Sequence, residues 1–519
     1  MAQAYYLAGD VPGAGPGITL LHGNAPRPPG ARVPANPERE HFMKQTFTGQ
    51  PDPAPRDAEI LIIGGGLSGA SLAAQLLRQP GRRRILVIEP RAELGRGEAY
   101  SATELGHTLN GNAARMSIDP DNPDDLTQWL TQHIAEGGWP ESAGQPVPIS
   151  ELFPPRGLFG VYVQQRLAEA RALGLEQGSS VEHVRSEVVD LQGHEGGIAL
   201  TLADGRQLRG AVAVLATGMF PAARTRQTHS SGLNAAALDP WDVNAMARLD
   251  PMSRVLIIGS GLTMVDAVVS LEQAGHRGPI EVFSRHGLLP HVRRQPPAWV
   301  DFLGQDPAIR SPRQLLRELR RQCCQALAQG IDWQAPLDTV RVHIPRLWSQ
   351  ASDFQRRQFV RHVRPWWESH HHRSPPLSDE LVRRLHAQGR LRIHAASYQG
   401  LEPDSEGRLA IRLRYRGSRE STRVLGDALI NSSGIEYDWR RVDRPLPRQL
   451  LARGLVQPGP LALGISAEPD GAVHDAQGRA GERLFAMGPP LRGLWWESTA
   501  VTDVALQAKA LAIRLAALL

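Results

Sequence analysis

Cysteine and lysine are nearly absent from this sequence of 519 residues. Its two cysteines, Cys323 and Cys324, are adjacent, so they match neither a disulfide framework, a CxxC redox motif nor a zinc site. Lys44 and Lys509 are the only lysines, which disfavours a Schiff-base or lysine general-base mechanism and leaves arginine as nearly the only cation. These absences predict a protein of the reducing cytoplasm with no structural metal site.

Long apolar runs and basic-aromatic clusters typical of nucleic-acid binding are also missing. No run approaches the roughly 20 residues that span a bilayer, and the start MAQAYYLAGDVPGAGPG has no signal-peptide pattern. The net charge is +5, but the arginines are scattered along the chain. The sequence therefore predicts neither a membrane nor a nucleic-acid partner. A small-molecule substrate is expected, and the oligomeric state stays open, a homo-oligomer being one option.

The stretch ILIIGGGLSGASLAAQLL, residues 60–77, reads as an apolar strand, a glycine turn and a helix. Gly64, Gly66 and Gly69 form GxGxxG, and Glu89 lies at the end of the next apolar run. The glycines let the backbone approach a pyrophosphate at the helix N-terminus, and the acid accepts hydrogen bonds from a ribose. We therefore expect a dinucleotide site that includes Leu67 and Ser68.

A second unit of the same kind, RVLIIGSGLTMVDAVVSL, occupies residues 254–271. Gly259 and Gly261 keep the phosphate approach, while Met264 replaces the third glycine. Ser284 and Arg285 stand where the first unit has its acid, and arginine suits a ribose 2′-phosphate. The pattern favours NADPH over NADH, with Leu262 and Thr263 also at the site; the alternative is a solvated Arg285. The site that ends at an acid suits FAD, and the site that ends at an arginine suits NADPH. A hydride would pass from NADPH to FAD.

A weak internal repeat indicates how the rest of the chain divides into domains. Residues 181–218 and 391–434 each read as alternating strands around a turn, followed by a buried strand that stops at a glycine. The expected fold class is α/β, with two Rossmann-like dinucleotide-binding domains and a helical insertion. The expected parts are a Pro/Gly-rich arm (1–55), the FAD domain (56–245), the NADPH domain (246–294), the insertion (295–388), the NADPH domain again (389–435) and a return to the FAD domain (436–519), ending in a helix over 498–519.

Several motifs resemble the two-dinucleotide-binding flavoproteins, and one branch in particular. They are GRGEAYS (95–101), LNGNAARM (109–116), PRGLFGVYV (155–163), SRHGLLP (284–290) and WWESTAV (495–501). That branch is the FAD/NAD(P)-binding family that includes amino-acid N-hydroxylating monooxygenases such as the L-aspartate N-hydroxylases. The resemblance implies that Asn110 and Met116 line the flavin, and that Gly488 and the last helix present N–H groups to its pyrimidine end. Our list for the FAD site also includes Val188, Gly218 and Thr499, although Thr499 is equally readable as a helix cap.

The segment FVRHVRPWWESHHHRSPP, residues 359–376, is the densest polar stretch in the chain. Three interpretations stay open: a metal site, a basic helix end over packed tryptophans, or a pocket for an anionic group. Under the last one, Arg361, Arg364 and Arg373 would hold a substrate carboxylate. Asn110, His362 and Arg364 are the candidate catalytic residues.

The classes of two-dinucleotide flavoenzyme differ in the group that accepts electrons from the reduced flavin. A disulfide reductase needs a cysteine pair beside the flavin, and no iron–sulfur or haem pattern is present. The favoured function is an NADPH-using, FAD-dependent monooxygenase, with O2 as co-substrate and a flavin C4a-hydroperoxide that N-hydroxylates an amino acid or small amine. The alternatives are a flavin oxidoreductase without oxygen transfer and a non-enzymatic redox sensor that binds both dinucleotides.

Overall fold

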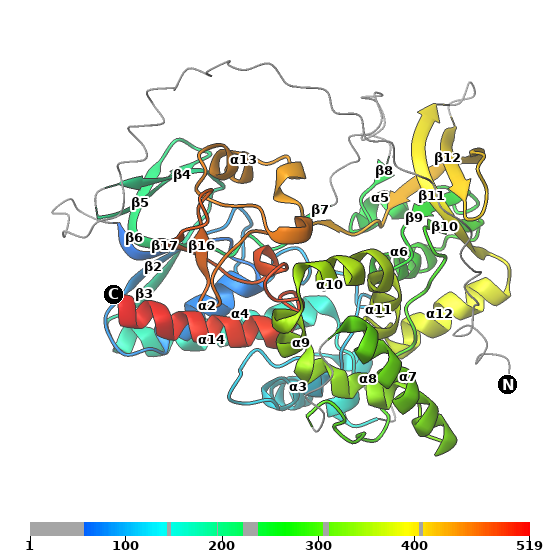
Figure 1. The fold of residues 1–519 in the computed structure, drawn as a ribbon, viewed down its shortest axis with the longest axis horizontal. Coiled ribbons are helices and arrows are strands. Elements are labelled where there is room, and N and C mark those ends of the chain that lie inside the picture. The colour runs from blue at the N-terminus through cyan, green and yellow to red at the C-terminus, as the bar shows by residue number, and fades with distance from the viewer. Residues whose placement is uncertain (1–56, 143–146, 195, 222–236, 305–310, 404–407) are drawn as a thin grey trace, which may run out of the picture. The chain divides into compact units, whose positions relative to one another are not determined.

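The computed structural model describes residues 57–142, 147–194, 196–221, 237–304, 311–403 and 408–519. The predicted N-terminal arm at 1–55 lies outside these residues. The described chain forms two mostly parallel sheets, each with helices packed on it, and a group of further helices (Figure 1). The expected α/β class with two Rossmann-like units is confirmed.

The first sheet has eight strands, and its main path runs β16-β17-β6-β1-β2-β3. The pairs from β17 to β3 are parallel, whereas β4 and β5 form an antiparallel hairpin that joins β6. A strand from near the C-terminus thus completes the first sheet, to which the C-terminal segment was expected to return. Its strands are β1 (Ala58–Ile63), β2 (Arg84–Ile88), β3 (Ser180–Val184), β4 (Val188–His194), β5 (Gly197–Leu202), β6 (Gln207–Leu215), β16 (Ala472–His474) and β17 (Ala480–Ala486).

The central strand β1 is buried on both faces, which explains its unbroken apolar run. Because side chains alternate along a strand, Ile60 and Ile62 join one core, and Leu61 and Ile63 join another. The first core lies under the helices and the second lies under β4, β5 and α13 (Pro445–Ala452).

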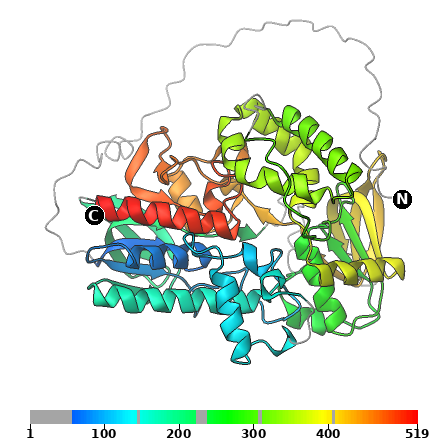
Figure 2. The ribbon, with the colours of Figure 1, turned by 90° about the horizontal axis from the view of Figure 1, so that it is seen from below.

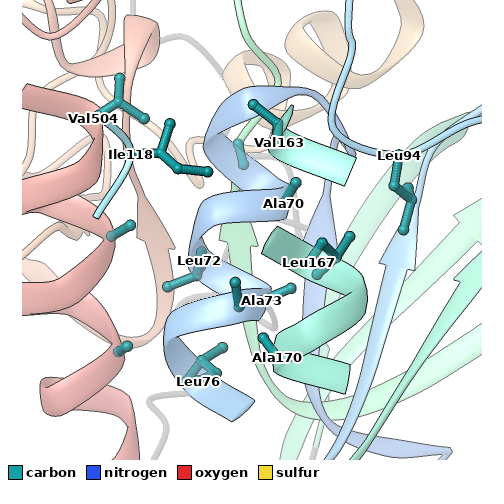
Figure 3. Close-up of a cluster of buried hydrophobic side chains, with 14 of the residues drawn as sticks. Ala70, Leu72, Ala73, Leu76, Leu94, Ile118, Val163, Leu167, Ala170 and Val504 are labelled. Atoms are coloured by element: carbon teal, nitrogen blue, oxygen red, sulfur yellow. The ribbon is translucent and has the colours of Figure 1, made fainter. Parts of the chain in front are cut away.

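Three helices lie side by side over the first core: α14 (Val501–Leu518), α2 (Leu67–Leu77) and α4 (Arg156–Glu176) (Figure 2). Helix α2 is buried along nearly its whole length and runs between the other two. Figure 3 shows Leu167 and Ala170 of α4 on one side of it and Val504 of α14 on the other. The small residues Ala70 and Ala73 of α2 allow this close packing.

The second sheet repeats the first plan with seven strands in the order β13-β12-β11-β10-β9-β14-β8. Strand β11 serves two partners, because its first part pairs in parallel with β10 and its second part pairs antiparallel with β12. The strands are β8 (Ala237–Leu238), β9 (Val255–Ile258), β10 (Ile280–Ser284), β11 (Leu391–Pro403), β12 (Leu409–Tyr415), β13 (Thr422–Gly426) and β14 (Ala428–Asn431). Helices α5 (Val243–Ala247), α6 (Leu262–Gln273) and α12 (Pro376–Ala387) pack with them.

The chain crosses between the two sheets at a two-stranded antiparallel ribbon, β7 (Phe220–Pro221) with β15 (Ile435–Glu436). Each strand follows one of the glycine-ended strands of the repeat. The helical insertion contains α7 (Pro312–Ala328), α8 (Gln334–Val340), α9 (Ile344–Gln350), α10 (Asp353–Gln358), a π-helix (Phe359–Val363) and α11 (Arg364–His371). Outside the insertion, helix α3 (Asp125–Ala135) lies in the long segment between β2 and α4.

Two of the expected domain boundaries differ from the observed pairing. Strand β8 pairs with β14, so the second domain includes residues before 246. Helix α12 packs on α6, and its Val382 and Leu385 belong to the core under β9 and β10. It is therefore the crossover helix of the second domain and not part of the insertion. None of the helices in the described residues is long and apolar enough to cross a membrane.

Candidate functional site

The first glycine turn joins β1 to α2 through a backbone path that only glycine fits. Gly64 has φ +105°, and a Cβ there would lie 2.3 Å from the carbonyl oxygen of Ala216. A Cβ at Gly69 would lie 1.9 Å from the carbonyl oxygen of Gly64. Strand and helix therefore pack in backbone contact, which fixes the helix N-terminus over the turn.

The N-terminus of α2 is open to an anion. Gly66 is its N-cap, no side chain caps the helix, and its first turn contains no acid. The first N–H groups of the helix, at Leu67 and Ser68, therefore have no intrahelical acceptor. A Cβ at Gly66 would lie 3.3 Å from Gly97 Cα, and one at Gly488 would lie 2.5 Å from Ser68 Oγ. Two glycine loops thus close around the helix start, as a pyrophosphate site requires.

The Glu89 carboxylate, 4% exposed, is held in place at the end of β2. Its Oε2 accepts the N–H of Gly65 at 2.9 Å, and its Oε1 accepts the N–H of Arg91 at 3.1 Å. An acid anchored to the glycine turn has the position expected of a ribose acceptor.

The segment expected to line the flavin, residues 109–116, contacts Arg293. The carbonyl oxygen of Asn110 accepts Arg293 Nε at 2.9 Å. Met116 is half-buried, and a Cβ at Gly111 would lie 2.9 Å from its sulfur. Asn112 is buried and its Oδ1 has no hydrogen-bond partner among the described residues.

The other residues expected at FAD fall into three environments. Val188 is buried in β4 opposite Leu202. Gly218 follows β6 with φ +69° and nothing within 4 Å of a Cβ built on it. Thr499 is half-buried, but Ala500 is the N-cap of α14, so the interpretation of Thr499 as a helix cap is wrong. Helix α14 begins at Val501, not at 498, because the preceding residues form turns. The role of all three in FAD binding stays a prediction.

The second glycine turn joins β9 to α6. Gly259 has φ +101°, and a Cβ there would lie 2.1 Å from the carbonyl oxygen of Ser432. Gly261 is the N-cap of α6, with nothing within 4 Å of a Cβ built on it. The helix has no side-chain cap and no acid in its first turn, where Leu262 and Thr263 are half-buried. This second open N-terminus also suits a pyrophosphate.

Ser284, at the end of β10, organises the turn that carries Arg285. Its Oγ lies 2.8 Å from Ser260 Oγ and accepts the N–H of Gly287 at 3.1 Å. Arg285 is exposed and no hydrogen bond or ion pair to it is recorded within the described part of the chain. The serine thus holds the turn while the arginine faces solvent.

A second arginine reaches the same corner from the far end of β12. The N–H of Arg416 donates to the carbonyl oxygen of Ala395 at 2.8 Å, and a Cβ at Gly287 would lie 3.4 Å from the Ala395 Cβ. Burial, Arg416 and Arg285 together lower the pKa of His286. The corner is therefore positively charged, as a phosphate would require.

Buried polar contacts join the two dinucleotide-binding domains. His107 Nε2 lies 2.7 Å from Ser270 Oγ and 3.1 Å from the carbonyl oxygen of Asp266. Arg156 Nη2 lies 3.1 Å from Asp266 Oδ2. Ser270 and Asp266 lie on α6, whereas His107 and Arg156 come from the first domain.

The arginines expected to hold a carboxylate do not converge. Arg361 is exposed on the π-helix, as is the catalytic candidate His362. Arg373 is fully buried, with Nη1 2.8 Å from Asp338 Oδ1. The three arginines thus lie in different surroundings and do not form one pocket, and the binding of a substrate carboxylate by any of them stays a prediction.

Arg364 is half-buried and contacts an acid and two aromatic rings. Its Nε lies 2.7 Å from Glu368 Oε1, and its guanidinium lies over the rings of Tyr437 and Trp496. Arg364 is thus paired on one side and stacked on the other. No cluster of three or more metal-ligating side chains is found in the described ranges, the histidine run included.

A buried carboxylate lies where α11 meets residues 495–498, the WWES segment. Glu497 is 3% exposed, and its Oε1 lies 3.6 Å from His371 Nε2. Burial raises the pKa of Glu497 to about 7, although Arg492 and Arg341 oppose the shift. Burial lowers the pKa of His372 to about 4. Glu497 is the sole acid in the motif WWESTAV, and this is the feature of the sequence that could have identified it as a candidate.

Cysteine lies outside these sites. Cys323 is half-buried and Cys324 is exposed, both on α7 of the insertion. Burial raises the pKa of the Cys323 thiol to about 11. A thiol of this kind is a poor nucleophile at neutral pH.

Comparison with known proteins agrees with this geometry. Residues 61–220 match a family model described as FAD-NAD(P)-binding. That range runs from within β1 to the crossing strand β7. No curated protein sequence matches the chain.

Solved structures match over most of the chain at low sequence identity. An ornithine N-hydroxylase from Kutzneria sp. 744, solved with reduced FAD, NADP+ and L-ornithine, is 14% identical with a TM-score of 0.60, covering 89% of this chain and 99% of that one. An L-lysine 6-monooxygenase from Pseudomonas syringae is 15% identical with a TM-score of 0.58, covering 88% and 99%. A cadaverine monooxygenase from Erwinia amylovora, bound to FAD, is 10% identical with a TM-score of 0.60, covering 88% and 94%. The chain therefore has the fold of the two-dinucleotide-binding flavoproteins.

Proposed function

We propose that the chain is an FAD-dependent, NADPH-using monooxygenase that N-hydroxylates an amino acid or small amine. The observation that carries the proposal is the pair of open helix N-termini, one beside an anchored acid and one beside an exposed arginine. The likeness to N-hydroxylating flavoenzymes supports the same function. The described residues contain no cysteine pair beside the first turn, which disfavours a disulfide reductase.

The residues present fit both cofactors. At the first turn, Gly66 and Gly97 leave room for the FAD pyrophosphate and Glu89 receives the ribose. At the second turn, Gly261 leaves room for the NADPH pyrophosphate and Arg285 pairs with the 2′-phosphate. When bound, FAD supplies a hydride acceptor and then an oxygen-activating centre.

The polypeptide itself binds and orients the cofactors and the substrate, and it excludes water from them. Trp348, Phe359 and Trp496 pack against one another with ring centroids 4.8 to 5.9 Å apart. They form an apolar wall between the insertion and the WWES segment. Such a wall keeps bulk water from a reactive oxygen species.

The test is a coupling assay. The purified protein is given NADPH under air with L-ornithine, L-lysine, L-aspartate or cadaverine, and NADPH loss, peroxide and hydroxylamine are measured. We expect one amine to accelerate NADPH loss and to yield hydroxylamine in place of peroxide. NADPH loss that no amine accelerates, with peroxide as the sole product, favours the flavin oxidoreductase instead. No NADPH loss at all favours the redox sensor.

A further inference from the structure

Four polar side chains form a cluster between helix α6 and the first domain. His107 and Arg156 come from the first domain, and Asp266 and Ser270 lie on α6. His107, Asp266 and Ser270 are 1%, 5% and 1% exposed, so bulk water does not solvate them. Polar contacts across the cluster therefore replace hydration, which makes the cluster sensitive to the position of α6.

One ion pair connects the two sides of this cluster. Arg156 Nη2 lies 3.1 Å from Asp266 Oδ2, and no second cation forms an ion pair with Asp266 within the described residues. Burial raises the pKa of Asp266, and the charges of Arg156 and His107 oppose that rise. Because a buried carboxylate needs a compensating charge, α6 is tied to the Arg156 side chain.

The backbone of the first domain holds Arg156 in place for this contact. Arg156 is the first residue of α4, and its N–H donates to the carbonyl oxygen of His107 at 2.7 Å. Its Nε donates to the carbonyl oxygen of Thr108 at 3.2 Å, and its guanidinium lies 5.6 Å from the centre of the Trp241 ring. Trp241 precedes α5 of the second domain, so this guanidinium contacts that domain twice. A side chain that is already held loses little further freedom when it pairs with Asp266.

The ion pair lies between the segments expected to hold the two cofactors. His107 belongs to the same stretch of chain as Asn110, whose carbonyl oxygen accepts Arg293 Nε at 2.9 Å. On the other side, Asp266 lies about one turn from the N-terminus of α6, the helix expected to hold the NADPH pyrophosphate. A change at this ion pair therefore changes the distance between the two sites.

We propose that the Arg156–Asp266 pair positions α6, and with it the nicotinamide of bound NADPH, for hydride transfer to the flavin; this rests on the proposed function. In that transfer NADPH loses a hydrogen nucleus with two electrons and the flavin gains them, while the ion pair exchanges neither protons nor electrons. Arg156 and Asp266 are thus positioning residues that act through α6. Because a misplacement of about 1 Å can slow a reaction by about 100-fold, loss of the pair slows hydride transfer more than it weakens NADPH binding.

The test compares Arg156→Gln with Arg166→Gln on the same helix. Arg166 Nε lies 2.9 Å from Asp125 Oδ2, and these side chains are 18% and 10% exposed, against 16% and 7% for Arg156 and Asp266. The two ion pairs are thus similarly buried, but the Arg166–Asp125 pair lies within the first domain. Loss of either pair destabilises the fold, and only loss of the Arg156 pair releases α6.

Flavin bleaching is followed without oxygen at a series of NADPH concentrations, which separates the limiting rate from the dissociation constant of NADPH. We expect Arg156→Gln to keep its FAD and its dissociation constant, and to lose about 10- to 100-fold in the limiting rate. Arg166→Gln should keep the wild-type limiting rate, even where its melting temperature falls as far. Asp266→Asn, which keeps the shape of the acid, should repeat the effect and carries the test if Arg156→Gln does not fold. Arg156→Lys, which keeps the charge, should restore part of the rate.

Three results would overturn the inference. Limiting rates in Arg156→Gln and Asp266→Asn that equal the wild-type rate show that α6 is positioned without the pair. An equal loss of rate in Arg166→Gln shows that lowered stability slows the transfer. Weaker NADPH binding with an unchanged limiting rate shows that the pair acts on binding alone. If NADPH does not bleach the wild-type flavin, the proposed function and the inference fail together, whereas bleaching that is unchanged in the variants defeats the inference alone.

Discussion

The turn after β1 and the turn after β9 share one backbone path but differ at two positions. In the first, a Cβ at Gly69 would overlap the carbonyl oxygen of Gly64 at 1.9 Å, whereas Met264 at the matching position is fully buried in its own core. Helix α6 is therefore set far enough from its strand to admit a side chain. The close approach of the backbone to a phosphate and the close contact between helix and strand place separate requirements on the sequence. Only the first of these requirements applies to both turns.

The second difference lies at the end of the next strand. Glu89 accepts backbone N–H groups and is fixed before any ligand binds. Arg285 is exposed, and Ser284 holds its turn instead. An anchored acid suits a resident cofactor such as FAD, and a free arginine suits one that exchanges in each cycle.

Gly69→Ala is expected to have the largest effect, because the added methyl collides with backbone that cannot move away. We expect folded, flavin-containing protein to be lost almost entirely. Gly261→Ala is the comparison variant in the second turn, where Met264 already occupies the position that matches Gly69. Nothing lies within 4 Å of a Cβ at Gly261, so this variant should fold normally. Soluble yield and flavin absorbance measure both. A yellow, stable Gly69→Ala protein would remove the distinction between the turns.

Arg285→Ala should weaken NADPH and leave NADH nearly unchanged. Losing a charge-assisted phosphate contact costs about 1.5–3 kcal/mol, or roughly 10- to 150-fold in affinity. Steady-state KM values for the two cofactors measure the effect. Arg416→Ala should show a smaller change of the same kind, and equal effects on NADH would mean that neither arginine contacts the 2′-phosphate.

Stability should fall with pH because of Glu497. Its pKa rises from 4.5 to about 7 on folding, so the folded protein holds this proton more tightly than the unfolded chain. The resulting stabilisation is present below pH 4.5 and is lost as the pH rises through about 7. Relative to Glu497→Gln, the wild-type free energy of unfolding should fall by about 3 kcal/mol across that window. Denaturant titrations at a series of pH values measure this, and parallel curves for the two proteins would contradict the burial of an ionisable Glu497.

The smallest change is expected from Thr499→Ala. Ala500, not Thr499, is the N-cap residue of α14, so removal of the hydroxyl should change the free energy of unfolding by no more than a surface substitution does, within about 0.5 kcal/mol. Asp242→Ala offers the contrast, because its side chain accepts the N–H of Ala245 as a true cap of α5. Thermal melts of both variants test this ranking.

The sequence predicted best those features that local chemistry dictates. The two glycine turns and Glu89 follow from short motifs with strict backbone requirements, whereas the return of the C-terminal segment to the first sheet was expected as the simplest place for that segment. The boundary at α12 was wrong because a crossover helix and an inserted helix have the same amphipathic, arginine-rich pattern. The proximity of Glu497 to His371 was missed because only the folded chain brings residues 371 and 497 together.

We propose that hydride passes from NADPH at the second turn to FAD at the first. The most direct measurement mixes the yellow protein with NADPH in the absence of oxygen and follows the flavin absorbance. We expect full bleaching with NADPH at concentrations where NADH bleaches slowly, and Arg285→Ala should need about 10- to 150-fold more NADPH for the same rate. A flavin that stays oxidised in excess NADPH would contradict the account.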